Sequence, residues 1–205
     1  MTPLEFCLYL QNLATPDFNS FNMYANTSMF EKEAVIARKN LLRYLTEMSK
    51  RKPSVLLVGE APGKDGCAIS GIPFTSEYQL LNEPFFSLSS YSTLNQGKPI
   101  KERTATAFWN ILKESNRLPL LWNIYPFHPF DPKTRKNRCP NTAEIEVGKE
   151  ILEKLLSIFD IIKIYAVGRT AENALKGHPL FGGYIRHPSY GGIKECREKL
   201  LNILS

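Results

Sequence analysis

Three polar side chains follow short apolar runs of the sequence and are candidates for acid–base chemistry or hydrogen bonding. Glu60 comes just after the run Val55–Val58, Asn123 lies near the end of 118–125, and His187 ends a run that begins at Tyr184. Taken singly, each has an ordinary structural explanation: a solvated acid, a turn-forming amide or a structural hydrogen-bonder. If the runs are parallel strands, however, their carboxyl ends share one edge of a sheet, and the three side chains converge there.

Two turns near Glu60 suggest what the pocket holds. The segment Gly59-Glu60-Ala61-Pro62-Gly63 brings backbone amides close to a ligand, because glycine carries no Cβ. A second turn, Gly71–Thr75, is placed to hold the aromatic face of Phe74 over the same crevice. A strand, a tight loop, an acid and an aromatic side chain together indicate a pocket for a flat ring.

The elements that position these residues alternate between strand and helix. The apolar periodicity predicts strands at 54–58, 118–125, 161–167 and 184–187. It predicts helices at 31–49, 104–114 and 193–204. Two more helices are expected, one that begins at Asn141 and a short one that ends at Lys176. This alternation predicts an α/β fold, a three-layer αβα sandwich around a mostly parallel four-stranded sheet. We expect one domain over 1–205 with an N-terminal helical extension over about 1–50. Residues 83–103 read as a long loop over the pocket.

Composition narrows the class of protein. The 205 residues are 43% hydrophobic, which is ordinary for a globular domain, and 26 basic against 20 acidic residues give a net charge of +6. The charge is compatible with a polyanionic partner, but simple solubility explains it equally well. No run approaches the roughly 18–20 apolar residues that a membrane span needs, and no signal peptide is evident, so we expect a cytoplasmic monomer.

The sequence also contains a cluster of basic residues and four cysteines, whose roles have to be considered. Lys133, Arg135, Lys136 and Arg138 form a basic loop, which is either simply solvated or a phosphate-contacting rim. Four cysteines lie far apart with no C-x-x-C pair, so we expect neither disulfides nor a metal site. The segment around Lys64 lacks the spacing of a Walker phosphate loop.

The ordered motifs resemble a known family. Gly59–Gly63, then Gly71-x-Pro-Phe74, then Asn123, then His187-Pro188-Ser189 look like the motifs of the uracil-DNA glycosylase superfamily, and together they span most of the chain. The branch that they resemble most is that of the thermophile-type enzymes with an iron–sulfur cluster. Those relatives have a C-x-x-C pair near the N-terminus, where this chain has only Cys7, so we predict no cluster and no cofactor.

The resemblance implies a role for each motif. A deaminated base, uracil first, is flipped from single- or double-stranded DNA, and its N-glycosidic bond is hydrolysed to leave an abasic site. Phe74 would stack on the base, Asn123 would read its edge, and backbone amides over Ala61, Pro62 and Gly63 would hold it or position water. The expected catalytic residues are Glu60, which orients or deprotonates water, and His187, which binds the uracil O2. Pro188, Ser189 and Tyr190 would contact DNA.

One departure from the family keeps alternatives open. Members with strong uracil activity carry Asp or Asn where this chain has Ala61, so the water-activating role falls to Glu60 or is partly unfilled. The alternatives are a glycosylase for hypoxanthine or xanthine, and a non-catalytic protein that binds damaged or single-stranded DNA. No lysine stands among the motifs for Schiff-base chemistry, so we expect a monofunctional enzyme.

Overall fold

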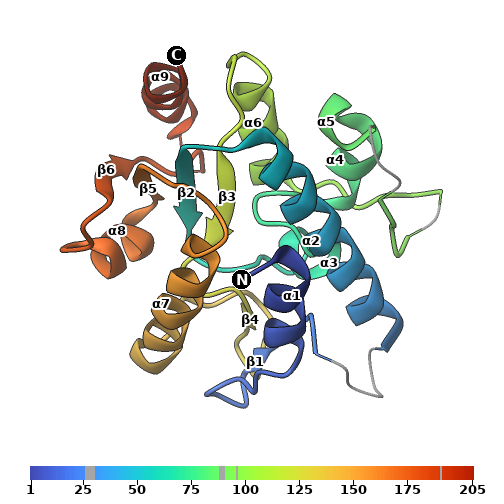
Figure 1. Cartoon of the computed structure of the whole chain (residues 1–205). Helices are drawn as coiled ribbons and strands as arrows, with labels where there is room; N and C mark the ends of the chain where they lie inside the picture. The colour runs from blue at the N-terminus through green and yellow to red at the C-terminus, as the bar shows by residue number, and fades with distance from the viewer. Residues whose placement is uncertain (26–30, 88–90, 96, 190) are drawn as a thin grey trace.

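A four-stranded parallel sheet forms the centre of the protein. A computed structural model describes residues 1–25, 31–87, 91–95, 97–189 and 191–205. The strands run in the order β3-β2-β5-β6, and every neighbouring pair is parallel (Figure 1). Their bounds are β2 (Val55–Gly59), β3 (Leu120–Asn123), β5 (Lys163–Val167) and β6 (Phe181–Ile185). The predicted α/β class with a parallel sheet is confirmed.

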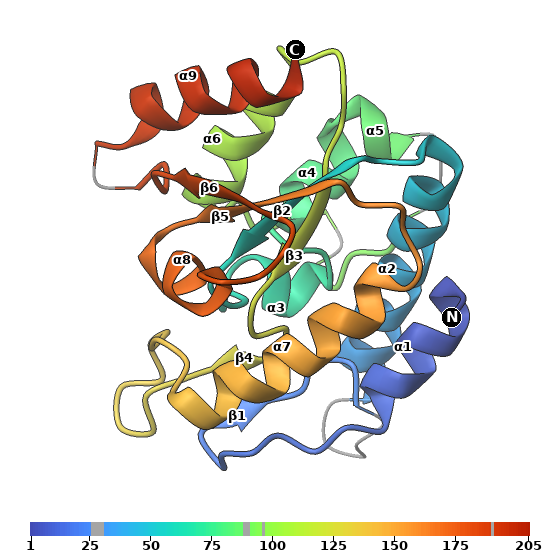
Figure 2. The ribbon, with the colours of Figure 1, turned by 60° about the vertical axis from the view of Figure 1, so that its left-hand side comes forward.

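Helices cover both faces of this sheet. Figure 2 shows α6 and α9 over one face, and α7 and α8 on the other. The helices of the described residues are α1 (Pro3–Gln11), α2 (Glu31–Arg51), α3 (Cys67–Ser70), α4 (Glu77–Asn82), α5 (Pro84–Ser87), α6 (Arg103–Leu112), α7 (Thr142–Leu156), α8 (Arg169–Leu175) and α9 (Ile193–Leu204). Helix, sheet and helix make the three layers that the alternation predicts. None of these helices is long and apolar enough to cross a membrane.

The sheet forms because its strands are apolar throughout. Leu56, Leu57 and Val58 in β2 have no exposed surface, as expected for a strand with helices on both sides. The same hydrophobic core extends from Phe6 in α1 to Leu204 in α9. The N-terminal helix therefore packs into the core through contacts with α2.

The order of the strands creates a crevice at their carboxyl ends. From β2 the chain moves to β3 on one side, and it later returns to β5 on the other side of β2. Because such crossovers are right-handed, the two connections lie on opposite faces of the sheet. The loops that follow β2 and β5 consequently diverge, and this divergence is where open α/β sheets bind ligands.

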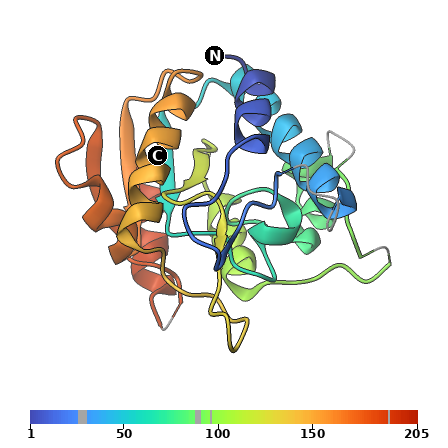
Figure 3. The same cartoon turned by 90° about the horizontal axis from the view of Figure 1, so that it is seen from below.

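A second, small sheet ties the N-terminal segment to the loop after β3. β1 (Ser20–Phe21) pairs antiparallel with β4 (His128–Pro129). Seen from below in Figure 3, the N-terminal segment lies beside the loop that contains β4. Two-residue strands leave no periodic pattern, so the sequence did not predict this pairing.

The structure corrects some predicted bounds. Helix α5 lies within the segment predicted as one loop over 83–103, and among the described residues of that segment only Glu102 lines the cavity discussed below. The last strand begins at Phe181 instead of Tyr184. Gly182 and Gly183 interrupt its apolar pattern, although Gly182 is needed because a Cβ there would lie 2.8 Å from the ring of Tyr165.

Candidate active site

A cavity of about 510 Å³ lies at the carboxyl ends of the strands. It receives residues from the ends of β2, β3, β5 and β6, and from the N-terminus of α6. It brings together seven residues that the sequence singled out, namely Glu60, Ala61, Gly63, Phe74, Asn123, His187 and Ser189. A volume of this size is within the usual range of small-molecule sites, roughly 300–1,000 Å³.

Three other predicted site residues lie elsewhere or outside the described residues. Pro62 is buried, and its carbonyl oxygen is 2.7 Å from Nδ1 of His128. This contact joins residues 59–63, which we call the motif loop, to the segment after β3. Pro188 is buried between His187 and Ser189. Tyr190 lies outside the described residues.

Phe74 is held in an unusual backbone conformation against the cavity. Its φ is +55°, in the left-handed region that residues other than glycine rarely adopt. One face of its ring stacks on Phe108, with 4.4 Å between centroids and 15° between planes. A Cβ at Gly59 would lie 2.5 Å from Cζ of Phe74, so only glycine at this position leaves room for the ring. A strained backbone conformation costs on the order of 1–3 kcal/mol and is common at ligand sites.

Asn123 places an amide beside the ring. It is 4% exposed, and as the last residue of β3 it is paired with Gly59, the last residue of β2. Its Nδ2 lies 3.9 Å from Sγ of Cys67. Burial raises the pKa of Cys67, so this thiol stays protonated at neutral pH. Asn123 therefore offers both a donor and an acceptor in a largely dry wall of the cavity.

His187 is a neutral imidazole whose tautomer follows from its hydrogen bond. The backbone N–H of Ser189 donates to Nδ1 at 3.2 Å, which leaves the ring proton on Nε2. Burial lowers the pKa of His187, and the carboxylates of Glu102 and Glu60 oppose this only partly. The ring is thus uncharged near pH 7, and its Nε2–H, which has no hydrogen-bond partner among the described residues, can donate to a ligand.

Glu60 is oriented by a residue that the sequence did not single out. The hydroxyl of Thr170, in the first turn of α8, donates a hydrogen bond to Oε2 of Glu60. This bond crosses the crevice between the loops that follow β2 and β5. The thiol of Cys139 also interacts with the Glu60 carboxylate, so that burial and this carboxylate both raise the pKa of Cys139. Thr170 comes three residues after β5, so its place at the end of a strand was the available signal.

Glu102 is a second carboxylate of the cavity that the sequence analysis missed. It caps α6, accepting from the N–H groups of Thr104 at 2.9 Å and Ala105 at 2.8 Å. The hydroxyl of Thr104 lies 3.4 Å from that of Ser189. The start of α6 therefore forms the wall of the cavity next to the His187 loop.

The predicted basic loop is a hairpin joined to the motif loop. We call residues 130–138 the basic hairpin; Phe130 and Asn137 form its bridge, and the carboxylate of Asp131 closes its turn by accepting two backbone N–H groups. Asn137 lines the cavity and accepts from the N–H of Lys64 at 3.1 Å. The side chains of Lys133, Arg135 and Lys136 are exposed on this hairpin.

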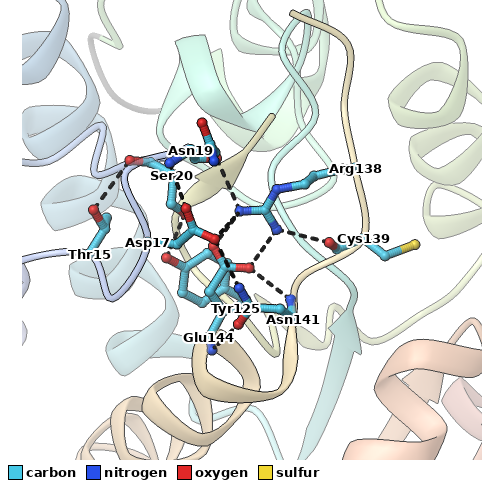
Figure 4. Close-up of polar contacts among 9 residues, drawn as sticks. All are labelled: Thr15, Asp17, Asn19, Ser20, Tyr125, Arg138, Cys139, Asn141 and Glu144. Atoms are coloured by element: carbon cyan, nitrogen blue, oxygen red, sulfur yellow. Dashed lines mark hydrogen bonds and ion pairs between the residues drawn. The ribbon is translucent and has the colours of Figure 1, made fainter. Parts of the chain in front are cut away.

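Arg138, the fourth predicted cation, has a structural partner. Its guanidinium donates to both carboxylate oxygens of Glu144, at 2.7 and 2.8 Å, and Asp17 lies 3.4 Å away (Figure 4). Its Nη2 also donates to the carbonyl oxygen of Asn19 at 3.1 Å. The side chain of Arg138 is 23% exposed and that of Glu144 is 0% exposed. Arg138 thus fixes the base of the hairpin to α7 and to the N-terminal segment.

The donor set does not fit a metal or an iron–sulfur cluster. Cys7, Cys67, Cys139 and Cys196 lie in four different segments, and all are free thiols. Within the described residues, no three His, Cys, Asp or Glu side chains are grouped so that they could hold a metal ion.

Fold and cavity together define an α/β protein with a polar, aromatic-lined pocket at the switch point of a parallel sheet. Residues 46–203 match the family described as the uracil DNA glycosylase superfamily, and the chain belongs to that superfamily. Membership supports DNA glycosylase as its class of activity and confirms the resemblance seen in the motifs.

A solved structure extends the likeness to nearly the whole chain. Wild-type SMUG2 of Pedobacter heparinus matches with a TM-score of 0.66 and 17% sequence identity, over 99% of this chain and 97% of that one. At this identity the likeness concerns the fold. No functionally curated protein matches the sequence.

Proposed function

We propose that the protein is a monofunctional uracil-DNA glycosylase, which flips uracil out of DNA and hydrolyses its N-glycosidic bond. The observation that carries the proposal is the meeting of Phe74, Asn123, neutral His187 and Glu60 around one cavity. Each supplies one requirement of the reaction. The first two hold the base, the third stabilises the leaving group and the fourth acts on water.

Base binding rests on Phe74 and Asn123. The free face of Phe74, opposite Phe108, stacks on the flipped ring. The amide of Asn123 pairs with the edge of uracil, its oxygen accepting from N3–H and its nitrogen donating to O4. Cytosine presents the opposite pattern at these two atoms and is disfavoured, because buried polar groups would be left unpaired.

Bond cleavage rests on His187. As the bond between C1′ and N1 breaks, its electron pair moves to the uracil ring and negative charge develops on O2. Nε2–H of His187 donates to that oxygen. Because the imidazole is neutral, it stabilises the anion through a hydrogen bond without transferring a full proton, and loss of such a donor costs about 100- to 1,000-fold in rate.

Glu60 completes the reaction at the sugar. With Oε2 held by Thr170, its other oxygen orients a water molecule toward C1′ and accepts the proton that this water loses on addition. The carboxylate also stabilises the positive charge that develops on the sugar. Among the described residues that line the cavity there is no lysine, which favours hydrolysis over Schiff-base lyase chemistry.

DNA is held next to the cavity by exposed cations. Lys133, Arg135 and Lys136 on the basic hairpin contact phosphates beside the flipped nucleotide, and the chain around Pro188 and Ser189 contacts the adjacent backbone. Because Asn137 joins the hairpin to the cavity wall, phosphate binding there positions the DNA relative to the pocket. Such contacts make the affinity for DNA depend on salt.

The test is a single-turnover assay on oligonucleotides that carry one uracil, hypoxanthine or xanthine, followed by alkaline cleavage of the abasic product. We expect product from uracil. Glu60→Gln should lower the rate about 100- to 10,000-fold, and Asn123→Ala should lower it severely. Glu150→Gln, an equivalent change on an exposed face of α7, serves as the control and should have no effect.

The other outcomes separate the alternatives. Product from a purine substrate alone would overturn uracil recognition by Asn123. Tight binding without release of any base would overturn catalysis and leave a DNA-binding protein. Trapping of a covalent complex by borohydride would overturn the monofunctional assignment.

A further inference from the structure

A second hollow lies between α6 and α9, beside the cavity. It is an open groove of about 600 Å³. Its floor is aliphatic and includes Ala107, Ile111 and Ile193, of which Ile193 is 52% exposed although it is a large hydrophobic residue. Ile111 is 3% exposed, so Ile193 is the large apolar side chain that this floor presents to solvent.

The groove and the cavity are bordered by the same two segments of chain. At the start of α6, Glu102 and Thr104 line the cavity while Lys101 and Arg103, which alternate with them, line the groove. At the start of α9, Gly192 packs so closely on the His187 loop that a Cβ would lie 2.1 Å from the carbonyl oxygen of His187. A DNA strand that leaves the cavity on this side therefore has to cross these segments to reach the groove.

The charge of the groove favours a polyanion. Lys101 and Arg103 are exposed at its cavity end, and Nζ of Lys101 lies 4.4 Å from the centre of the Tyr78 ring. At the far end, Arg197 of α9 forms an ion pair with Glu114, which lies just after the end of α6. The carboxylate of Glu102 faces the cavity and is occupied by the N–H groups that it caps. Against this one carboxylate, the two cations leave the cavity end with a net positive charge.

We propose that the α6/α9 groove binds the nucleotides of the DNA strand that flank the flipped base on one side. Lys101 and Arg103 contact their phosphates, and a base packs on the aliphatic floor at Ile193, a contact that does not depend on base identity. The strand crosses the cavity from the basic hairpin on one wall to this groove on the other. This inference rests on the proposed function, because it takes DNA as the partner.

The test measures binding to oligonucleotides that carry a stable abasic analogue, tetrahydrofuran, at one position, with both flanks or with either flank removed. The proteins are the wild type, Lys101→Gln/Arg103→Gln, and the matched control Lys52→Gln/Arg117→Gln. The control residues line another cavity, of about 430 Å³, at the start of β2 and hence at the opposite end of the sheet. Thermal unfolding verifies that both double variants are folded.

We call Lys101→Gln/Arg103→Gln the groove variant. Each single-strand phosphate contact contributes about 0.7 to the salt exponent, so two lost contacts lower it by about 1.4. At 0.1 M salt this corresponds to binding of the full oligonucleotide that is about 25-fold weaker. The salt slope of the groove variant should be smaller by about 1.4. Removal of one particular flank should weaken the wild type similarly and the groove variant hardly at all, and Ile193→Ser should reduce the effect of the same flank. The control should bind like the wild type.

Equal binding by the groove variant and the control would overturn the proposal, as would a flank effect of the same size in the wild type and the groove variant. Neither readout requires release of a base. If uracil is not released but the flank effect is present, the proposed function fails and the groove assignment stands.

Discussion

Removing the guanidinium of Arg138 should destabilise the protein far more than neutralising its partner Glu144. In Arg138→Met the carboxylate of Glu144, which has no exposed surface, loses its cation and must be buried alone or take up a proton. Breaking a buried pair in this way costs about 3–5 kcal/mol. In Glu144→Gln the cation that remains is 23% exposed and can be hydrated, and glutamine can still accept from the N–H of Asn141. We expect a cost of about 1–2 kcal/mol for this change.

Thermal and urea unfolding at pH 7 measure the difference. For a chain of this length about 2–4 °C corresponds to 1 kcal/mol, so the melting temperature should fall by about 6–20 °C in Arg138→Met and by about 2–8 °C in Glu144→Gln. The double variant leaves no fully buried charge unpaired, because Asp17 is 28% exposed, and it should be more stable than Arg138→Met alone. Equal losses in the two single variants, or a double variant no better than Arg138→Met, would refute this account of the pair.

The pH dependence gives an independent check. Burial raises the pKa of Glu144, but hydrogen bonds from Arg138 and from the N–H of Asn141 outweigh it, and the net pKa lies below the ordinary 4.5. The unfolded chain therefore takes up this proton at a higher pH than the folded one. The stability that the carboxylate contributes is complete above pH 4.5 and declines as the pH falls through the folded value. The gap between the wild type and Arg138→Met should close over the same range.

Three further predictions concern the cavity. Gly59→Ala should displace the ring of Phe74, because the added Cβ would lie 2.5 Å from Cζ, and the affinity for a uracil-containing oligonucleotide should fall at least tenfold; unchanged affinity would contradict the stacking role. Thr170→Val should lower the excision rate by freeing Oε2 of Glu60, while Thr170→Ser should restore most of it in the same single-turnover assay. Burial lowers the pKa of His187, so the excision rate should stay level down to pH 6.5 and decline only below it as the ring protonates; a decline that begins above pH 6.5 would argue against a neutral imidazole.

The sequence predicted the sheet and the residues at its edge because both leave local patterns. The run around Leu56–Val58 is apolar without alternation, and Glu60, Asn123 and His187 each stand near the end of such a run. Parallel pairing then brings them together whatever the details of the loops. That is why the predicted residues share one cavity although the bounds of the strands were shifted by up to three residues.

The sequence did not predict roles that depend on contacts between distant segments. Arg138 looked like the other cations of its loop, because nothing in the order of residues shows that Glu144 is buried beneath it. In the sequence, Glu144 stands three residues after Asn141, a capping-box spacing that accounts for it without Arg138. Thr170 and Glu102 likewise stand at the start of helices, where a capping or surface role is the usual explanation. Their importance comes from what lies opposite them in space.

The pairing of β1 with β4 has a consequence for the order in which the chain is made. Asp17 accepts a hydrogen bond from Asn141, which is 124 residues further along the chain. The carbonyl oxygen of Asn19 accepts hydrogen bonds from Phe130 and Arg138, which are also far along the chain. During synthesis the N-terminal segment therefore stays without these partners until two thirds of the chain has emerged, and such long-range contacts form late. The family match begins only at residue 46, yet a protein shortened to that match would lose Asp17, Asn19 and Ser20. The basic hairpin would then lack its contacts with the N-terminal segment. In the full chain these contacts form late, although the N-terminal segment is synthesised first.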